Sequence, residues 1–270
     1  MVKIVRPDDI EEGSLARYGI YGENGVGKTT FLTTIPDEER LLVISEEGQN
    51  IKPLKGYRHI KIAPVSQWKD VEDLHKFLID MAKSKPELAP TAVAFDGWPI
   101  RLIINKATGA HLGRGEEREW LSNPPDQRPS NWGDWDKVAG LSNYGILCFL
   151  RLPVHMIFLF DEEAPRLDKG EITRKGGPML PTQALAGARR YLEVIGRMFV
   201  DIQSSVADDF IPDTAEEVRR LLIGKHEFFF SKGPTHALGY TITNPSWDKL
   251  LPALTARPLR INGHANKEES

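Results

Sequence analysis

The sequence is poor in cysteine and in long apolar runs. Cys148 is the only cysteine among 270 residues, which excludes an intrachain disulfide or a cluster of thiolate ligands. The most apolar stretch, 146–160, is interrupted by Arg151, Pro153 and His155 and is too short to cross a membrane. The first residues lack the apolar segment of a secretory signal. We expect a cytoplasmic protein without membrane contact, in which Cys148 is a small buried hydrophobic residue.

The chain also lacks a strong charge of either sign. It has 35 Lys and Arg against 38 Asp and Glu, a net charge of -3, and 40% hydrophobic residues. This composition is ordinary for a soluble globular protein and gives no global attraction to nucleic acid or acidic lipid. Local basic loops remain compatible with DNA binding.

Short apolar runs alternate with helical patterns, which is typical of an α/β fold with a mainly parallel central sheet and helices on both faces. The expected parallel strands are 16–21, 41–45, 59–63, 92–95 and 155–160. Two helices are expected. The first has Val71, Leu74, Leu78 and Met81 on one face, and the second runs from 180 to 195. Two later strands, 198–206 and 219–231, are expected as antiparallel additions to the sheet edge. We predict one domain over 1–256 and a polar tail over 257–270.

Two long connections, 106–130 and 161–181, do not fit a minimal sheet-and-helix arrangement. Connections of this length in a compact domain are usually functional or disordered.

The strongest motif lies between the first strand and the first helix. It reads Gly22-Glu23-Asn24-Gly25-Val26-Gly27-Lys28-Thr29, followed by Thr30, and matches G-x-x-x-x-G-K-[ST] at every fixed position. A glycine-rich loop between strand and helix directs backbone N–H groups at an anion. Lys28 would reach the β- and γ-phosphates of ATP, and the Thr29 hydroxyl would bind Mg²⁺. The alternative is a glycine-rich turn that matches by chance.

A second metal-site residue is predicted at Asp96. The segment 91–96 is an apolar run that ends in this acid, as expected for a carboxylate that holds Mg²⁺ directly or through water. The alternative is an ordinary aspartate that begins a turn with Gly97.

Two glutamates, Glu46 and Glu47, follow the strand over 41–45. In a parallel sheet this strand end lies on the same edge as Gly22 and Asp96, where ligands bind. Either glutamate could activate water for hydrolysis, and a solvated acidic turn is the alternative.

This order of motifs resembles that of RecA-like ATPases, which have a P-loop, then a glutamate closing the next strand and an acid closing a later one. The chain looks most like the compact RecA-like ATPases encoded by phages, which act in single-strand annealing and recombination. Those proteins carry a D-T-E-G-like segment, from which 44–48 departs by lacking the aspartate. The resemblance covers roughly 15–239 in layout and implies a location in the host cytoplasm.

The resemblance also implies roles for later residues. A γ-phosphate sensor would lie at Asp161 or Glu162, at the end of the strand over 155–160. Lys232, after Phe229-Phe230-Ser231, would act on a neighbouring subunit's nucleotide, which implies a homo-oligomer. The alternative for Lys232 is a surface lysine beside a turn.

RecA-like proteins bind single-stranded DNA through two loops, which the resemblance places at the two long connections. The candidate DNA-binding cations are Arg114, Arg118 and Arg128 in the first and Arg166, Lys169, Arg174 and Lys175 in the second. Aromatic residues among such cations suit unstacked bases, and Trp120, Trp132 and Trp135 are the candidates. Acidic residues are interspersed in the first connection, and Trp132 and Trp135 are at least as consistent with core packing.

Other classes of nucleotide-binding protein are alternatives to a RecA-like ATPase. A GTPase would carry N-K-x-D, whereas 105–108 has the first two letters without the aspartate. A P-loop kinase would use an Arg-rich lid, for which 166–175 is a candidate. A helicase loader, another protein-partnered motor and a non-catalytic ATP-controlled scaffold would use the same phosphate site. We favour a Mg²⁺-dependent ATPase that couples ATP to single-stranded DNA in phage recombination, annealing or replication, with phage or host proteins of those processes as further partners.

Overall fold

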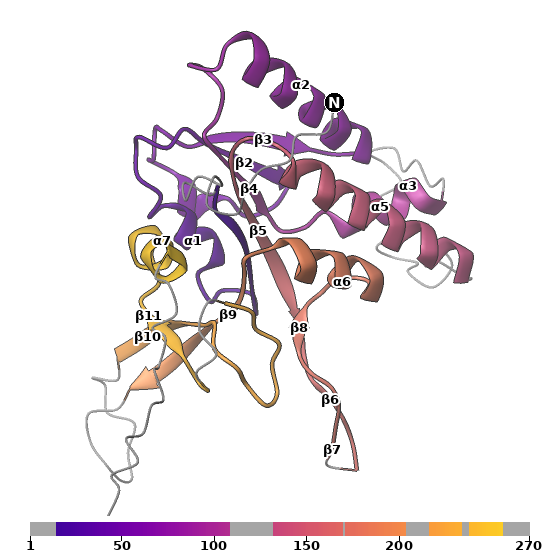
Figure 1. Ribbon diagram of the computed structural model, residues 1–270, viewed down its shortest axis with the longest axis vertical. Helices are drawn as coiled ribbons and strands as arrows, with labels where there is room; N and C mark the ends of the chain where they lie inside the picture. Colours follow the sequence, from indigo (N-terminus) through magenta and orange to yellow (C-terminus); the bar gives the residue numbers. More distant parts are fainter. Residues whose placement is uncertain (1–14, 109–131, 170, 204–215, 234–237, 256–270) are drawn as a thin grey trace, which may run out of the picture.

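The chain forms a central sheet flanked by helices (Figure 1). The computed structural model describes residues 15–108, 132–169, 171–203, 216–233 and 238–255. The strands are β1 (Arg17–Gly22), β2 (Leu41–Glu46), β3 (Lys61–Val65), β4 (Ala92–Asp96), β5 (His155–Glu163), β6 (Arg166–Asp168), β7 (Glu171–Arg174), β8 (Gly177–Pro178), β9 (Val194–Gln203), β10 (Glu216–Leu222) and β11 (Thr241–Thr243). The helices are α1 (Lys28–Leu32), α2 (Trp68–Ser84), α3 (Ile100–Thr108), α5 (Trp132–Leu150), α6 (Thr182–Tyr191) and α7 (Trp247–Thr255), with a 3₁₀ turn at Lys52–Leu54.

The sheet is mostly parallel. Its strand order is β11-β10-β9-β1-β5-β4-β2-β3, with β8 paired to β5. Neighbouring strands from β9 to β3 run parallel, whereas β10 is antiparallel to both β9 and β11. The expected mainly parallel sheet is therefore confirmed, and so is an antiparallel edge, which β10 and β11 form. The strand expected over 198–206 was predicted to be antiparallel, which was wrong, because β9 pairs parallel to β1.

Helices cover both faces of this sheet, as the alternating sequence pattern predicted (Figure 1). Buried side chains of α2, α3, α5 and α6 join one hydrophobic cluster, and those of α1 and α7 join the other. The predicted first helix is confirmed in α2, where Val71 and Leu78 are buried. Gln67 and Asp70 form a capping box that fixes its start. None of the described helices has the length and apolarity needed to cross a bilayer.

Several boundaries differ from expectation. The helix expected to reach 195 ends at Tyr191, because β9 begins at Val194 and pairs with β1. The strand expected over 219–231 ends at Leu222. Beyond it, isolated bridges such as Ile195 to Lys232 replace a continuous ladder. Pairing with existing strands therefore outweighs local helical preference at these positions.

The two long connections contain structure that the sequence pattern did not reveal. The connection over 161–181 includes the end of β5, the β6–β7 hairpin and β8. The connection over 106–130 begins inside α3, and its remaining residues lie outside the described part of the chain. Cys148 lies on α5 and is only partly buried, so the expectation of a buried cysteine was wrong.

Aromatic packing under the sheet generates a testable prediction. Phe158 is fully buried, stacks on Phe95 with ring centroids 5.5 Å apart, and meets Trp98 at 5.7 Å. Phe158→Ala should lower the free energy of unfolding by about 3–5 kcal/mol, because it removes buried apolar area and leaves a cavity. Urea unfolding measures this loss. Phe77→Ala, at a side chain 53% exposed on α2, should change stability by less than about 0.5 kcal/mol, and equal losses would contradict the packing described.

Candidate nucleotide-binding site

The carboxyl ends of four parallel strands bring the predicted site residues to one edge of the sheet. Gly22 at the end of β1 lies opposite Asp161 of β5. Ser45 near the end of β2 lies opposite Asp96 at the end of β4. Ligands bind at such edges in open α/β sheets, because the loops that follow the strands surround a common space.

The loop after β1 has the backbone geometry that its glycines predict. Gly25 and Gly27 have φ values of 87° and 100°, in the left-handed region that favours glycine. A Cβ at Gly22 would lie 2.3 Å from the carbonyl oxygen of Met198, so this position has no room for a side chain. The helix that follows comprises only Lys28–Leu32, so its macrodipole is small. Anion binding here would depend mainly on the loop N–H groups and on Lys28.

The Lys28 ammonium group folds back onto the loop and onto β5. Its Nζ donates to the carbonyl oxygens of Gly22 at 2.6 Å and Glu23 at 3.0 Å. It also lies 3.5 Å from Oδ1 of Asp161. The Lys28 side chain is 11% exposed, whereas that of Asp161 is 61% exposed and can turn into solvent. The cation is therefore held where phosphate oxygens could replace its present partners.

Asp96 and Thr29 form the second half of the site. The Thr29 hydroxyl donates to Oδ1 of Asp96 at 2.8 Å, and Asp96 is only 2% exposed. The other carboxylate oxygen, Oδ2, is buried and has no hydrogen-bond partner among the described residues. Burial raises the pKa of the Asp96 carboxyl, and the Thr29 hydrogen bond and the Lys28 charge oppose this rise. An oxygen left without a donor in a buried carboxylate requires an explanation, and a bound cation supplies one.

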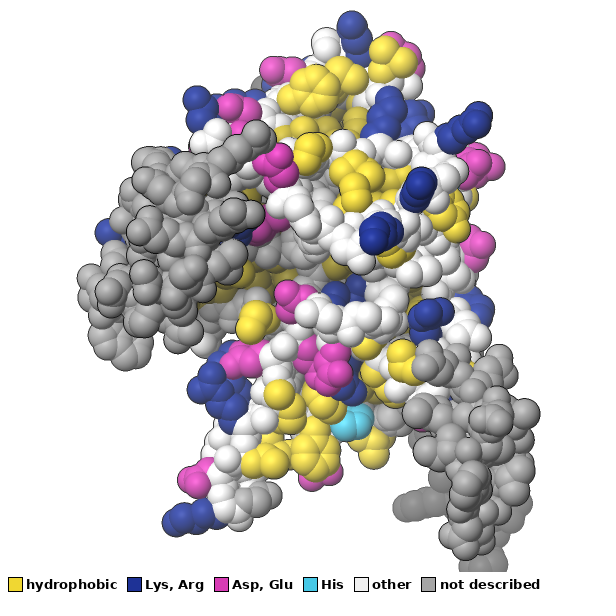
Figure 2. Space-filling model, turned by 180° about the vertical axis from the view of Figure 1, so that it is seen from behind, with side chains coloured by type: hydrophobic (Ala, Val, Ile, Leu, Met, Phe, Trp, Pro, Cys, Tyr) yellow, Lys and Arg dark blue, Asp and Glu magenta, His cyan; other side chains and the backbone are white. Residues whose placement is uncertain are grey.

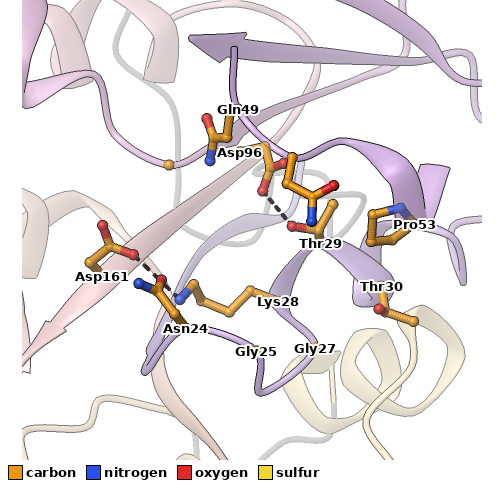
Figure 3. A pocket seen from close by; sticks show the side chains of 12 residues that line it. Asn24, Gly25, Gly27, Lys28, Thr29, Thr30, Gln49, Pro53, Asp96 and Asp161 are labelled. Carbon is orange, nitrogen blue, oxygen red and sulfur yellow. Dashed lines mark hydrogen bonds and ion pairs between the residues drawn. The ribbon is translucent and has the colours of Figure 1, made fainter.

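These groups surround a cavity of about 310 Å³ (Figure 3). Its walls are Asn24, Gly25 and Gly27 of the loop, Lys28, Thr29 and Thr30 of α1, the residues Gln49, Asn50 and Pro53 that follow β2, and Asp96, Gly97 and Asp161 at the ends of β4 and β5. Figure 3 shows Lys28 directed toward Asp161 and Thr29 directed toward Asp96, on either side of the same space.

The donor set fits Mg²⁺. Thr29 and Asp96 offer hydroxyl and carboxylate oxygens, the hard ligands that this ion prefers. Mg²⁺ commonly takes one or two protein ligands and completes its octahedron with water and phosphate oxygens. Among the described residues, no group of three or more His, Cys, Asp or Glu side chains could hold a metal by itself. The site suits a metal that arrives with a nucleotide.

The two candidate glutamates lie beside this cavity without lining it. Oε2 of Glu46 is 3.1 Å from Nε of Arg101, which places this carboxylate in an ion pair with α3. Glu47 follows β2, and its backbone N–H donates to the carbonyl of Val65 at 2.9 Å. The cavity wall near them is formed instead by Gln49.

Of the two candidate sensors, only Asp161 faces the cavity. The carboxylate of Glu162 is 5% exposed, and its Oε2 lies 2.9 Å from Nε of Arg197. Lys232 is also engaged within the chain, because its Nζ donates to the carbonyls of Arg189 at 2.8 Å and Leu192 at 2.5 Å. It therefore caps the C-terminal end of α6, and its action on a neighbouring subunit stays a prediction.

The candidate DNA-binding residues divide between described and undescribed parts of the chain. Those of the first connection, Arg114, Arg118 and Arg128 together with Trp120, lie outside the described residues. Trp132 and Trp135 both lie on α5, where the Trp135 side chain is exposed and does not support the core-packing alternative.

The second set of cations lies on and beside the β6–β7 hairpin. Arg166 and Arg174 pair with Glu163 at 2.9 Å and 2.8 Å. Nζ of Lys175 donates to the carbonyl of His226 at 2.7 Å, whereas Lys169 lies exposed at the hairpin turn with φ 49°. Figure 2 shows this hairpin at the lower left, with basic and acidic side chains intermixed.

Some cavity residues were missed from the sequence. Gln49, Asn50 and Pro53 follow the strand end that was identified, and extending the site by one turn would have included them. The sequence also gave no indication that Arg219 of β10 lies against this loop. A Cβ at Gly27 would lie only 2.7 Å from Nε of Arg219. Only the folding of the antiparallel edge brings Arg219 against the phosphate loop.

The buried Asp96 carboxylate predicts opposite effects on stability and on binding. Its pKa is higher in the folded chain than the ordinary 3.8, so the folded state binds more protons and this group lowers stability as pH rises above that value. Asp96→Asn should therefore raise the free energy of unfolding at neutral pH without ligand. The same change should weaken Mg²⁺-dependent ATP binding roughly tenfold to a hundredfold, because a charged ligand is lost.

Urea unfolding across pH and titration with ATP and Mg²⁺ measure the two effects of Asp96→Asn. Asp73→Asn, at an exposed acid on α2, is the matched control and should change neither quantity appreciably. Unchanged Mg²⁺-dependent ATP affinity in Asp96→Asn would contradict the metal role of this carboxylate.

Comparison with known proteins adds no assignment. No protein-family model matches the chain, and no curated protein is detectably similar to it in sequence. The functional interpretation therefore depends on the chain's own geometry, above all on Lys28 and on the Thr29–Asp96 pair at the edge of the sheet.

Proposed function

We propose that this chain is a RecA-like, Mg²⁺-dependent ATPase whose nucleotide site is the cavity at the carboxyl edge of the sheet. One observation carries the proposal: Lys28, Thr29 and Asp96 surround a single cavity, and each has the chemistry that a Mg²⁺–triphosphate needs. The strand order supports the RecA-like reading, because the P-loop strand β1 and the acid-bearing strand β4 flank β5.

The residues would act on ATP by exchanging partners. Lys28 would leave Asp161 and the Gly22 carbonyl for β- and γ-phosphate oxygens, whose negative charge is greater. Thr29 and Asp96 would hold Mg²⁺, which neutralises phosphate charge when bound. The loop N–H groups from Gly25 to Thr29 would donate to the remaining phosphate oxygens.

Two competing enzyme classes are less well supported. The GTPase reading lacks the aspartate of N-K-x-D, because Thr108 follows Ala107. The kinase reading needs Arg166 and Arg174 over the phosphates, yet both pair with Glu163 and neither is among the described residues lining the cavity. We therefore retain ATP hydrolysis as the reaction.

We further propose that the ATPase acts on single-stranded DNA, as a homo-oligomer and in phage recombination, annealing or replication. The support is the exposed hairpin that β5 carries beyond the nucleotide site. Asp161 lines the cavity, and two residues later Glu163 holds Arg166 and Arg174 of the hairpin. A change at the nucleotide therefore has a short covalent route to candidate DNA-binding cations.

Substitution of Lys28 tests whether ATP hydrolysis uses this site. Lys28→Ala should lower kcat for ATP hydrolysis by roughly 10²–10³-fold, because it removes a preorganised cation from the transferring phosphoryl group. Steady-state phosphate release with ATP and Mg²⁺ measures the effect. Lys61→Ala, at an exposed lysine on β3, is the control and should retain activity. Normal turnover in Lys28→Ala would show that the reaction does not use this site.

Substitutions in and beside the β6–β7 hairpin test the proposed DNA binding. Neutralising Arg166, Lys169, Arg174 and Lys175 together should weaken single-strand binding and reduce the slope of log K against log salt by about 0.7 for each lost phosphate contact. Glu163→Gln should act in the opposite direction, because it releases two arginines from their ion pairs. Fluorescence anisotropy with a labelled oligonucleotide across salt concentrations measures both. If neither variant changes the affinity or its salt slope, the hairpin does not bind DNA.

A further inference from the structure

We propose that Gln49 holds the water that attacks the terminal phosphate, a role that rests on the proposed ATPase function. Gln49 lies in the turn after β2, where its N–H donates to the Glu46 carbonyl at 3.1 Å and Gly48 adopts φ 92°. Its side chain lines the cavity together with Asp96 and Asp161. Figure 3 shows the Gln49 amide beside Asp96, directed into the space that Lys28 also faces.

Two contacts fix the orientation of this amide. The Ser45 hydroxyl, only 3% exposed, donates to Oε1 of Gln49 at 3.1 Å, which leaves the Nε2 donor for another partner. Gly97, next to Asp96, makes room for it: a Cβ there would lie 2.9 Å from Nε2, and the φ of 84° also favours glycine. Gln49 is an exposed residue, and the contacts with Ser45 and Gly97 orient its amide beside the Asp96 carboxylate.

An amide in this position can orient water without removing its proton. Nε2 can donate to the water oxygen, and Oε1 keeps one lone pair for a water hydrogen. The water oxygen then bonds to the γ-phosphorus as the bond from that phosphorus to the bridging oxygen breaks. The electron pair of the broken bond stays on ADP, and the water's proton leaves with inorganic phosphate or passes to solvent. In other P-loop enzymes a glutamine orients the attacking water in this way.

The neighbouring glutamates are placed less well for this task. The Glu46 carboxylate is paired with Arg101 at 3.1 Å, and neither Glu46 nor Glu47 is among the described residues lining the cavity. Moving either carboxylate to the terminal phosphate would also bring two negative groups together. Gln49 supplies polar contact at the cavity wall without that repulsion.

The test compares Gln49→Ala with Glu46→Gln and Glu47→Gln in the full chain. We expect Gln49→Ala to lower kcat by about a hundredfold, at least tenfold more than either glutamate variant. The dissociation constant for a fluorescent ATP analogue with Mg²⁺ should change by less than about threefold, because the amide acts on water and not on bound ATP. Gln183→Ala, at an exposed glutamine on α6, controls for loss of an amide elsewhere.

A transition-state analogue separates a direct role from a structural one. ADP with aluminium fluoride and Mg²⁺ should be retained by the wild-type chain and released at least tenfold faster by Gln49→Ala. Ser45→Ala should lower kcat by a smaller factor with unchanged ATP affinity, because the amide stays but loses its orientation. If the wild-type chain hydrolyses ATP and Gln49→Ala keeps full kcat, the Gln49 assignment is wrong and the ATPase stands. If the wild-type chain does not hydrolyse ATP, both proposals fall.

Discussion

The hydrogen bond from Thr29 to Asp96 connects the segment after β1 to a strand that is not its neighbour in the sheet. Thr29 lies in α1, which follows β1, Asp96 ends β4, and β5 lies between β1 and β4. The bond forms only because the parallel register aligns the ends of all three strands at one edge. The second oxygen of this buried carboxylate has no partner in the described part of the chain, a cost that folding alone does not explain. The arrangement is consistent with a site that is completed by a ligand.

The central strand β5 connects this site to the rest of the molecule. Three consecutive acids at its end each bind a cation: Asp161 binds Lys28, Glu162 binds Arg197, and Glu163 binds the hairpin arginines. The Asp161 side chain is exposed, so its contact with Lys28 is easily broken, whereas the ion pair of Glu162 with Arg197 is almost fully buried. Arg197 in turn lies 3.7 Å from the ring centroid of Phe229, which bridges to Gly176 beside the hairpin. At the end of β5 the middle acid, Glu162, is therefore held in a buried ion pair, whereas Asp161, which faces the cavity, has an exposed side chain.

The sequence predicted the elements that are specified locally. Strands β1, β2 and β4 are short apolar runs buried on both faces, and each lies within one residue of its expected range. The glycine-rich loop and Asp96 were predicted as site residues because few other roles require these residue types in this order, and the structure places them around one cavity. β3 was displaced by two residues, since its exposed face gives a weak hydrophobic pattern.

The features that the sequence did not reveal depend on contacts between distant segments. Val194 and Ile195 continue a helical pattern and join the sheet only because β1 offers an open edge. Arg219 reaches Gly27 from the antiparallel edge, and no spacing rule connects them. The role that we propose for Gln49 depends on the ion pair between Glu46 and Arg101 of α3, which the sequence does not show.

Calorimetric titration of the chain with ATP, in Mg²⁺ and then in EDTA, tests the central claim most directly. The geometry of Lys28, Thr29 and Asp96 predicts one ATP bound per chain, with affinity that falls at least tenfold when Mg²⁺ is removed. Absence of ATP binding, or binding that is indifferent to Mg²⁺, would show that this edge of the sheet does not hold a metal–triphosphate.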